Sequence, residues 1–105
     1  MNMPKDFLDE LIAERTRKNP RFPAMLAEAE RRLALGRKLA SLRTKASLSQ
    51  TLVAARMGTA ASVVSKLEAG ADVKLSTLQR YCAAIGQEFS PRLKTRPKAQ
   101  AKRAA

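Results

Sequence analysis

The stretch from residue 49 to residue 70, SQTLVAARMGTAASVVSKLEAG, constrains the fold of this chain more than any other. Counting from Gln50, a small residue stands fifth, a glycine ninth, and apolar residues fifteenth and eighteenth: Ala54, Gly58, Val64 and Leu67. A small fifth residue lets two steeply crossed helices approach closely, and glycine adopts the left-handed conformation of a tight turn without strain. We therefore predict two short helices joined by a turn at Gly58, which is the helix-turn-helix pattern; the alternative is a helical hairpin that merely packs.

The other face of the predicted second helix carries short or cationic side chains that can lie against a nucleic-acid groove: Ala61, Ser62, Ser65 and Lys66. A formal charge of +12 also indicates a polyanionic partner. The charge is uneven, since residues 1–30 hold six acids and five bases whereas residues 31–105 hold three acids and sixteen bases. Charge can serve solubility alone, but here the basic part coincides with the helix-turn-helix. The aromatic content of 4% argues against stacking on single-stranded nucleic acid.

Several classes of protein are disfavoured by what the chain lacks. With one cysteine, Cys82, there is no internal disulfide framework, and we interpret this residue as part of the core in a protein of a reducing compartment. Without histidine, zinc sites and histidine-based catalysis lose their usual ligand and base. No apolar run reaches membrane-spanning length, and the first residues lack the order of a signal peptide. We expect a cytoplasmic protein that is not an enzyme and has no cofactor, metal or membrane partner.

The first periodic segment spans residues 6–18. Its apolar residues fall at helical spacing, and acids occupy its early turns, where the helix dipole favours them: Phe7, Leu8, Leu11 and Ile12, with Asp6, Asp9, Glu10 and Glu14. A short amphipathic helix is marginal alone, so its apolar stripe must dock. It either folds back on its own domain or binds a partner protein, and the sequence leaves both open.

Prolines 20 and 23 end that helix, and residues 24–45 are rich in good helix formers. Whether they form one helix or two is open. Leu35, Leu39 and Leu42 would support the helix-turn-helix, and Gly36 is tolerable if neighbouring backbone comes close or if the helix bends there.

After the helix-turn-helix, the pattern from Ser76 to Gln79 predicts a capping box and a helix that runs to Ile85 and stops at Gly86. On this helix Leu78, Cys82 and Ile85 face the core, with Tyr81 beside them. Alternation around Phe89, Pro91 and Leu93 gives a faint strand signal, confined to an edge by the proline. Residues 95–105 have the composition of a disordered basic tail.

The segments LRTKASLSQTLVAARMGTAASVVSKLEAG and LSTLQRYCAAIG resemble the Xre/Cro-type helix-turn-helix family of phage and bacterial repressors. The resemblance spans residues 33–86 and implies an all-α fold. Its five-helix domain would dimerise and bind a palindromic operator, with each recognition helix in a major groove.

The resemblance also implies a set of DNA contacts. Gln50 and Thr51 would touch phosphate, and Arg43 and Lys45 would approach the DNA backbone. Base reading would fall to Ala61, Ser62, Ser65 and Lys66. The chain departs from the pattern at residues 60 and 61, where many relatives keep Ser as the helix cap and Gln as an adenine reader. Thr59 can cap one residue early, and Ala61 offers only a methyl contact.

The preceding segment, DFLDELIAERTRKNPRFPAMLAEAERR, is similar to the extension found in antitoxins of the HigA type, whose partner is a RelE/HigB-like ribonuclease toxin that cuts messenger RNA on the ribosome. We therefore expect three parts: residues 1–31 as a helical extension that binds toxin, residues 32–88 as the DNA-binding domain, and residues 89–105 as a short edge strand and disordered basic tail. The toxin contacts would be an apolar anchor and a charge complement: Phe7, Leu8, Leu11 and Ile12, with Asp9, Glu10 and Glu14. A free-standing phage-type repressor is the alternative within DNA binding, and a protein-interaction module or RNA-binding protein is the alternative outside it.

Overall fold

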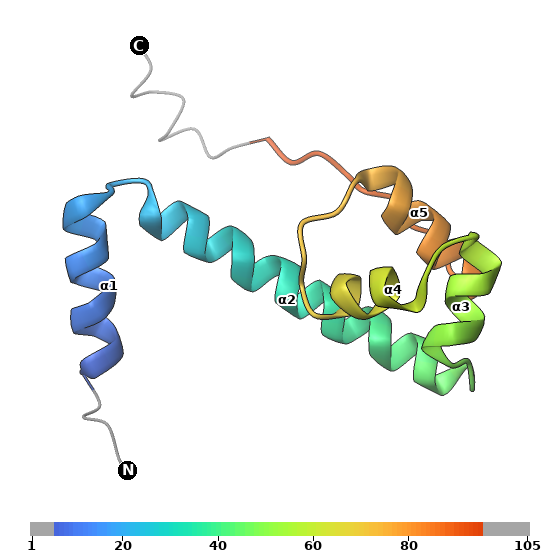
Figure 1. Cartoon of the computed structure of the whole chain (residues 1–105). Coiled ribbons are helices and arrows are strands. Elements are labelled where there is room, and N and C mark those ends of the chain that lie inside the picture. The colour runs from blue at the N-terminus through green and yellow to red at the C-terminus, as the bar shows by residue number, and fades with distance from the viewer. Residues whose placement is uncertain (1–5, 96–105) are drawn as a thin grey trace.

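A computed structural model describes residues 6–95 of the protein (Figure 1). The helices are α1 (Phe7–Lys18), α2 (Phe22–Lys45), α3 (Gln50–Met57), α4 (Ala61–Glu68) and α5 (Leu75–Ala84). The predicted all-α fold with a helix-turn-helix is confirmed. Within the described residues, α1 and the start of α2 form an extension, and the rest of α2 packs with α3, α4 and α5.

Helix α2 is a single helix of 24 residues, which settles whether this region forms one helix or two. Pro23 lies in the first turn of this helix. A backbone N–H in the first turn has no intrahelical acceptor, so the missing N–H of proline costs no hydrogen bond there. It continues through residue 31, so the predicted limit between the extension and the domain falls inside a helix.

Gly36 is the point where α4 crosses α2. A Cβ atom built on this glycine would lie 2.8 Å from the carbonyl carbon of Glu68 and 3.0 Å from the carbonyl oxygen of Leu67. The glycine is therefore required by close approach of neighbouring backbone, one of the two explanations offered by the sequence.

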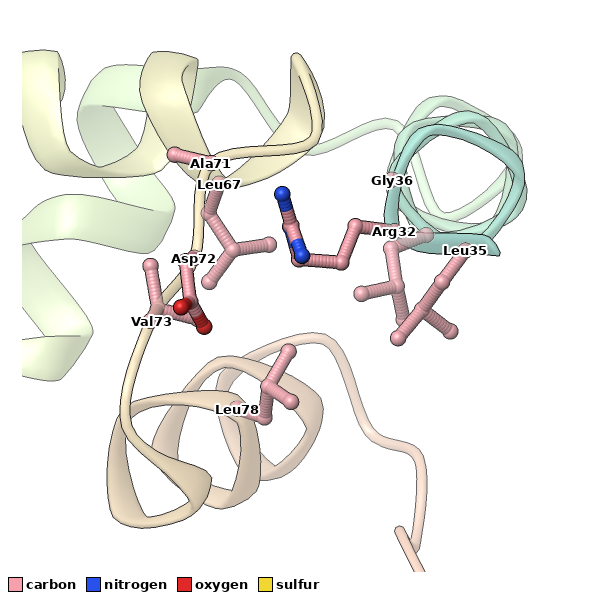
Figure 2. A pocket seen from close by; sticks show the side chains of 9 residues that line it. Arg32, Leu35, Gly36, Leu67, Ala71, Asp72, Val73 and Leu78 are labelled. Atoms are coloured by element: carbon pink, nitrogen blue, oxygen red, sulfur yellow. The ribbon is translucent and has the colours of Figure 1, made fainter. Parts of the chain in front are cut away.

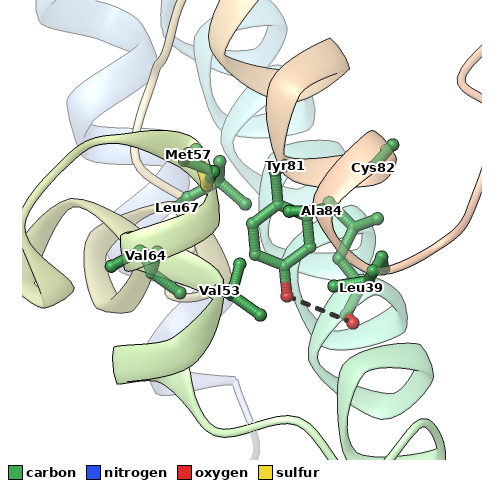
Figure 3. Packing of buried hydrophobic residues seen from close by; sticks show 10 residues of the cluster. Leu39, Val53, Met57, Val64, Leu67, Tyr81, Cys82 and Ala84 are labelled. Carbon is green, nitrogen blue, oxygen red and sulfur yellow. Dashed lines mark hydrogen bonds between the residues drawn. The ribbon is translucent and has the colours of Figure 1, made fainter.

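The core lies between the second half of α2 and the three short helices (Figure 3). Its members are Leu39, Val53, Ala54, Met57, Val64, Leu67, Tyr81, Cys82, Ala84 and Ile85. The predicted core residues of α5 are thus confirmed, with Leu78 half-buried beside them. Burial raises the pKa of the Cys82 thiol, as expected for a core residue.

An apolar pocket of about 170 Å³ remains between α2, the loop after α4 and α5 (Figure 2). Leu35, Leu67 and Leu78 point into it from three different elements. At its edge Arg32 donates from Nε to the carbonyl oxygen of Gly70, at 3.2 Å. This bond fixes the loop after α4 against α2 where apolar packing is incomplete.

Two predicted helix ends are confirmed. Ser49 caps α3, since its Oγ accepts from the backbone N–H of Leu52 at 3.0 Å. Gly58 ends the same helix with φ 71°, in the left-handed region where a side chain would be strained.

Two other expectations are wrong. The capping box at Ser76 does not form, because the extended residue before α5 is Lys74, which places Ser76 inside the first turn. No strand is found between residues 87 and 95, since the described part of the chain offers no strand to pair with. Phe89 packs against the core while Leu93 is fully exposed. The end of the predicted tail, residues 96–105, lies outside the described residues.

The apolar stripe of α1 docks on the first half of α2, away from the helix-turn-helix (Figure 1). Leu11 and Ile12 are half-buried there, but Phe7 and Leu8 remain 40% and 61% exposed, and no residue of α1 is fully buried. Folding back therefore satisfies only part of the stripe. Among the described residues, no helix combines the length and the apolar character that crossing a membrane requires.

Candidate nucleic-acid interface

Helix α4 separates its side chains into two faces. Val64 and Leu67 are buried in the core, and Glu68 is buried beside them. The predicted base-reading residues all lie together on the exposed face: Ala61, Ser62, Ser65 and Lys66. This helix can therefore present its polar face to a groove without disturbing the core.

The N-terminus of α4 has no side-chain cap. Ala60 occupies the cap position, with φ −82° and ψ 151°. The predicted cap by Thr59 is wrong, because the residue in extended conformation directly before the helix is Ala60, and Thr59 lies one position too early. The first N–H groups of α4 are left to solvent or to a ligand.

Replacing Ala60 by serine should stabilise the protein. The backbone already has the cap conformation, so a hydroxyl there can accept from an N–H of the first turn and add about 1 kcal/mol to the free energy of unfolding. Thermal unfolding followed by circular dichroism should show a midpoint several degrees higher. Ala69→Ser, at the other end of α4, is the matched control and should leave the midpoint unchanged. Equal midpoints for Ala60→Ser and the wild type would mean that those N–H groups gain nothing from a cap.

A buried ion pair joins α4 to α2. Glu68 is only 9% exposed, and its carboxylate accepts two bonds from Arg43: Nε to Oε2 at 2.6 Å and Nη2 to Oε1 at 3.0 Å. A third guanidinium nitrogen, Nη1, donates to the carbonyl oxygen of Leu48 at 2.9 Å. Arg43 thus ties together α2, the connector to α3 and the end of α4.

Two further donors complete the environment of the same carboxylate. The hydroxyl of Tyr81 donates to Oε2 at 2.5 Å, and Nε2 of Gln50 donates to Oε1 at 2.9 Å. Burial alone would raise the pKa of Glu68, but the hydrogen bonds from Arg43, Tyr81 and Gln50 outweigh it and lower the pKa below its ordinary value. Burial, followed by the bond to Glu68, raises the pKa of Tyr81. The carboxylate is therefore ionised and the phenol neutral at physiological pH.

This network changes the surroundings of two predicted DNA contacts. The side chain of Arg43 is 15% exposed and fully engaged within the domain, and Gln50 is half-buried with its amide on Glu68. Thr51 and Lys45 are exposed, and Thr59 is half-buried. The network was not foreseen from the sequence, although one signal was present: Glu68 stands four residues after Val64, on the apolar face of its helix.

The predicted toxin contacts lie on α1. Phe7, Leu8, Asp9, Glu10 and Glu14 are exposed, while Leu11 and Ile12 face α2. Between the two helices is an apolar groove lined by Leu8, Leu11, Ile12, Phe22 and Leu26, with Arg15 and Glu30 at its margins. Glu14 is 3.7 Å from Lys18 Nζ, an exposed contact of little energetic weight.

The domain defined by this geometry is also recognised by comparison with known proteins. Residues 34–91, more than half of the chain, match the family model described as a helix-turn-helix domain, and the chain belongs to this family.

The chain resembles, more particularly, the HigA antitoxins of the Xre type. It is 43% identical over 81 residues, 76% of its length, to antitoxin HigA1 of Mycobacterium tuberculosis, in both strain CDC 1551 and strain H37Rv. The chain spans about half the length of these relatives, 54%. Because 81 residues are more than the matched domain contains, the similarity extends beyond the helix-turn-helix.

Proposed function

We propose that the protein is the antitoxin of a type II toxin-antitoxin pair. It represses its own operon by binding a double-stranded operator as a homodimer, and it neutralises a RelE/HigB-like toxin that cleaves messenger RNA. The observation that carries the proposal is the similarity to an antitoxin, because this similarity extends beyond the helix-turn-helix domain.

The DNA-binding part rests on α4. Its exposed face carries short or cationic side chains, which suits a helix that enters the major groove of B-DNA. Lys66 is the residue best fitted to guanine, and Ser62 and Ser65 can bond to either type of base. Lys45 and Thr51, both exposed, supply phosphate contacts that add affinity without selecting sequence.

The toxin-binding part rests on α1. A ribonuclease must be positively charged to hold RNA, and Asp9, Glu10 and Glu14 offer the complementary charge. Phe7 and Leu8 are large apolar side chains that the fold leaves exposed, and Leu8 also lines the groove between α1 and α2. An apolar anchor surrounded by acids is a suitable surface for a basic protein.

Replacing Ser62 and Lys66 together by alanine should weaken the complex with operator DNA by about tenfold or more, since a good base contact contributes about 1–3 kcal/mol of discrimination. Binding to scrambled duplex should weaken much less. Gel shifts with the upstream DNA of its own gene, scrambled duplex and RNA measure all three affinities. The matched control is the pair Lys38→Ala and Ser41→Ala, which removes the same groups from the exposed face of α2. Equal losses on operator and scrambled DNA would remove Ser62 and Lys66 from base reading.

Deleting residues 1–18 should abolish binding of the toxin encoded beside this gene and leave operator binding largely intact. Leu8→Asp is a sharper test, because this side chain is exposed and its replacement does not touch the core. Co-purification with tagged toxin should fall sharply for Leu8→Asp and remain for Ala13→Asp, an exposed control on the same helix. Toxin binding that survived the deletion would place the interface elsewhere.

A free-standing phage-type repressor is the second candidate, because the helix-turn-helix domain alone would suffice for that function. A neighbouring reading frame for a toxin-like protein distinguishes the two.

A further inference from the structure

Gln50 and Glu68 connect the start of the first helix of the helix-turn-helix to the end of the second. Gln50 is the first residue of α3 and Glu68 is the last residue of α4, and the amide nitrogen of the first donates to the carboxylate of the second at 2.9 Å. The same α4 presents the predicted base-reading face, and the same α3 begins with N–H groups that carry partial positive charge.

A carboxylate can only accept hydrogen bonds, so it fixes the orientation of the amide that faces it. The NH₂ group of Gln50 must point to Glu68, which uses one of its two hydrogens. The second hydrogen of that NH₂ group then has a defined direction in a half-buried side chain. An amide without this constraint could turn over and present its oxygen, which a phosphate would repel.

We propose that Glu68 is a positioning residue for DNA binding: it orients the amide of Gln50 so that the remaining N–H donates to a backbone phosphate at the start of α3. This inference rests on the proposed binding of double-stranded DNA. It also gives Arg43 a role without direct contact, because its bidentate pairing neutralises Glu68 and removes the repulsion that a free carboxylate would exert on phosphate.

A double-mutant cycle tests the inference. Affinity of the full chain for a mixed-sequence duplex is measured by fluorescence anisotropy, since a phosphate contact does not depend on base sequence. Gln50→Ala and Glu68→Gln should each weaken binding by about tenfold, as for a hydrogen bond to a charged group. The double variant should bind about as weakly as either single variant, because both remove one contact. The slope of log affinity against log salt should be unchanged in Gln50→Ala, since a neutral donor releases no counterions.

Tyr81→Phe is the matched control, because it removes another hydrogen bond from the same carboxylate and leaves the bond to Gln50 in place. It should reduce stability but not DNA affinity. A loss of affinity in Tyr81→Phe equal to that in Glu68→Gln, or additive losses in the double variant, would overturn the positioning role and leave Glu68 as a purely structural residue. Failure of the wild type to bind any duplex would instead overturn the proposed function.

If Glu68→Gln does not fold, the side-chain amide of Gln50 can be followed by NMR in the wild-type chain. Its two hydrogens should have separate signals, and added duplex should shift mainly the one that does not face Glu68. Gln50→Met, which keeps the side-chain volume, should bind duplex as weakly as Gln50→Ala. Equal shifts of both amide signals, or wild-type affinity of Gln50→Met, would contradict the inference.

Discussion

Replacing Glu68 by alanine should lower the free energy of unfolding by about 3–5 kcal/mol, because it leaves the part-buried guanidinium of Arg43 without its partner. The loss of two further hydrogen bonds adds to this effect, since the carboxylate also accepts from Tyr81 and Gln50. Urea unfolding at neutral pH measures it. Glu88→Ala removes an exposed acid from the same chain and should change the free energy by no more than about 0.5 kcal/mol. Similar values for the two variants would mean that the ion pair contributes no more than a surface charge.

The difference between wild type and Glu68→Ala should depend on pH in one direction. The pKa of Glu68 is lowered in the folded protein, so its contribution is present above the pKa of glutamate in the unfolded chain. It is lost as the pH falls through the lowered pKa of the folded state. Unfolding curves collected from neutral to acidic pH should therefore converge for the two proteins at the acidic end. A difference that persisted unchanged would assign the effect of the substitution to lost packing.

Replacing Gly36 by alanine should destabilise the protein by about 2 kcal/mol, although alanine is the better helix former by about 1 kcal/mol. The added methyl group would overlap the backbone of Glu68, which cannot move aside without shifting α4 against α2. The sign of the change separates the two effects, since helix propensity alone predicts a gain. Urea unfolding of Gly36→Ala beside Ser41→Ala, an exposed site on the same helix, makes the comparison. A gain in stability at residue 36 would contradict the close crossing.

The helix-turn-helix could be predicted because several independent requirements coincide in a short stretch. Ala54, Gly58, Val64 and Leu67 each have a local physical reason, and the structure places each of them accordingly. The same helical periodicity also predicted which residues of α4 are exposed.

The parts that escaped prediction depend on contacts between distant residues. Arg43 looks like any other base in a basic chain, and only its meeting with Glu68, 25 residues later, shows that it lies inside the domain. The strand signal at residues 89–93 failed for the same reason, because a strand needs a partner that alternation alone cannot supply. Helix α5 begins two residues earlier than the capping-box pattern predicts, because the extended residue before the helix is Lys74 and not Ser76.

The unbroken course of α2 has a mechanical consequence. Fourteen residues separate its start from the crossing at Gly36, which is about 21 Å of helix at 1.5 Å per residue. A molecule bound to α1 would thus be held by a continuous helix, at a set distance and angle from α4, and not by a flexible linker. Helix α2 also offers a protease no exposed loop between Phe22 and Lys45.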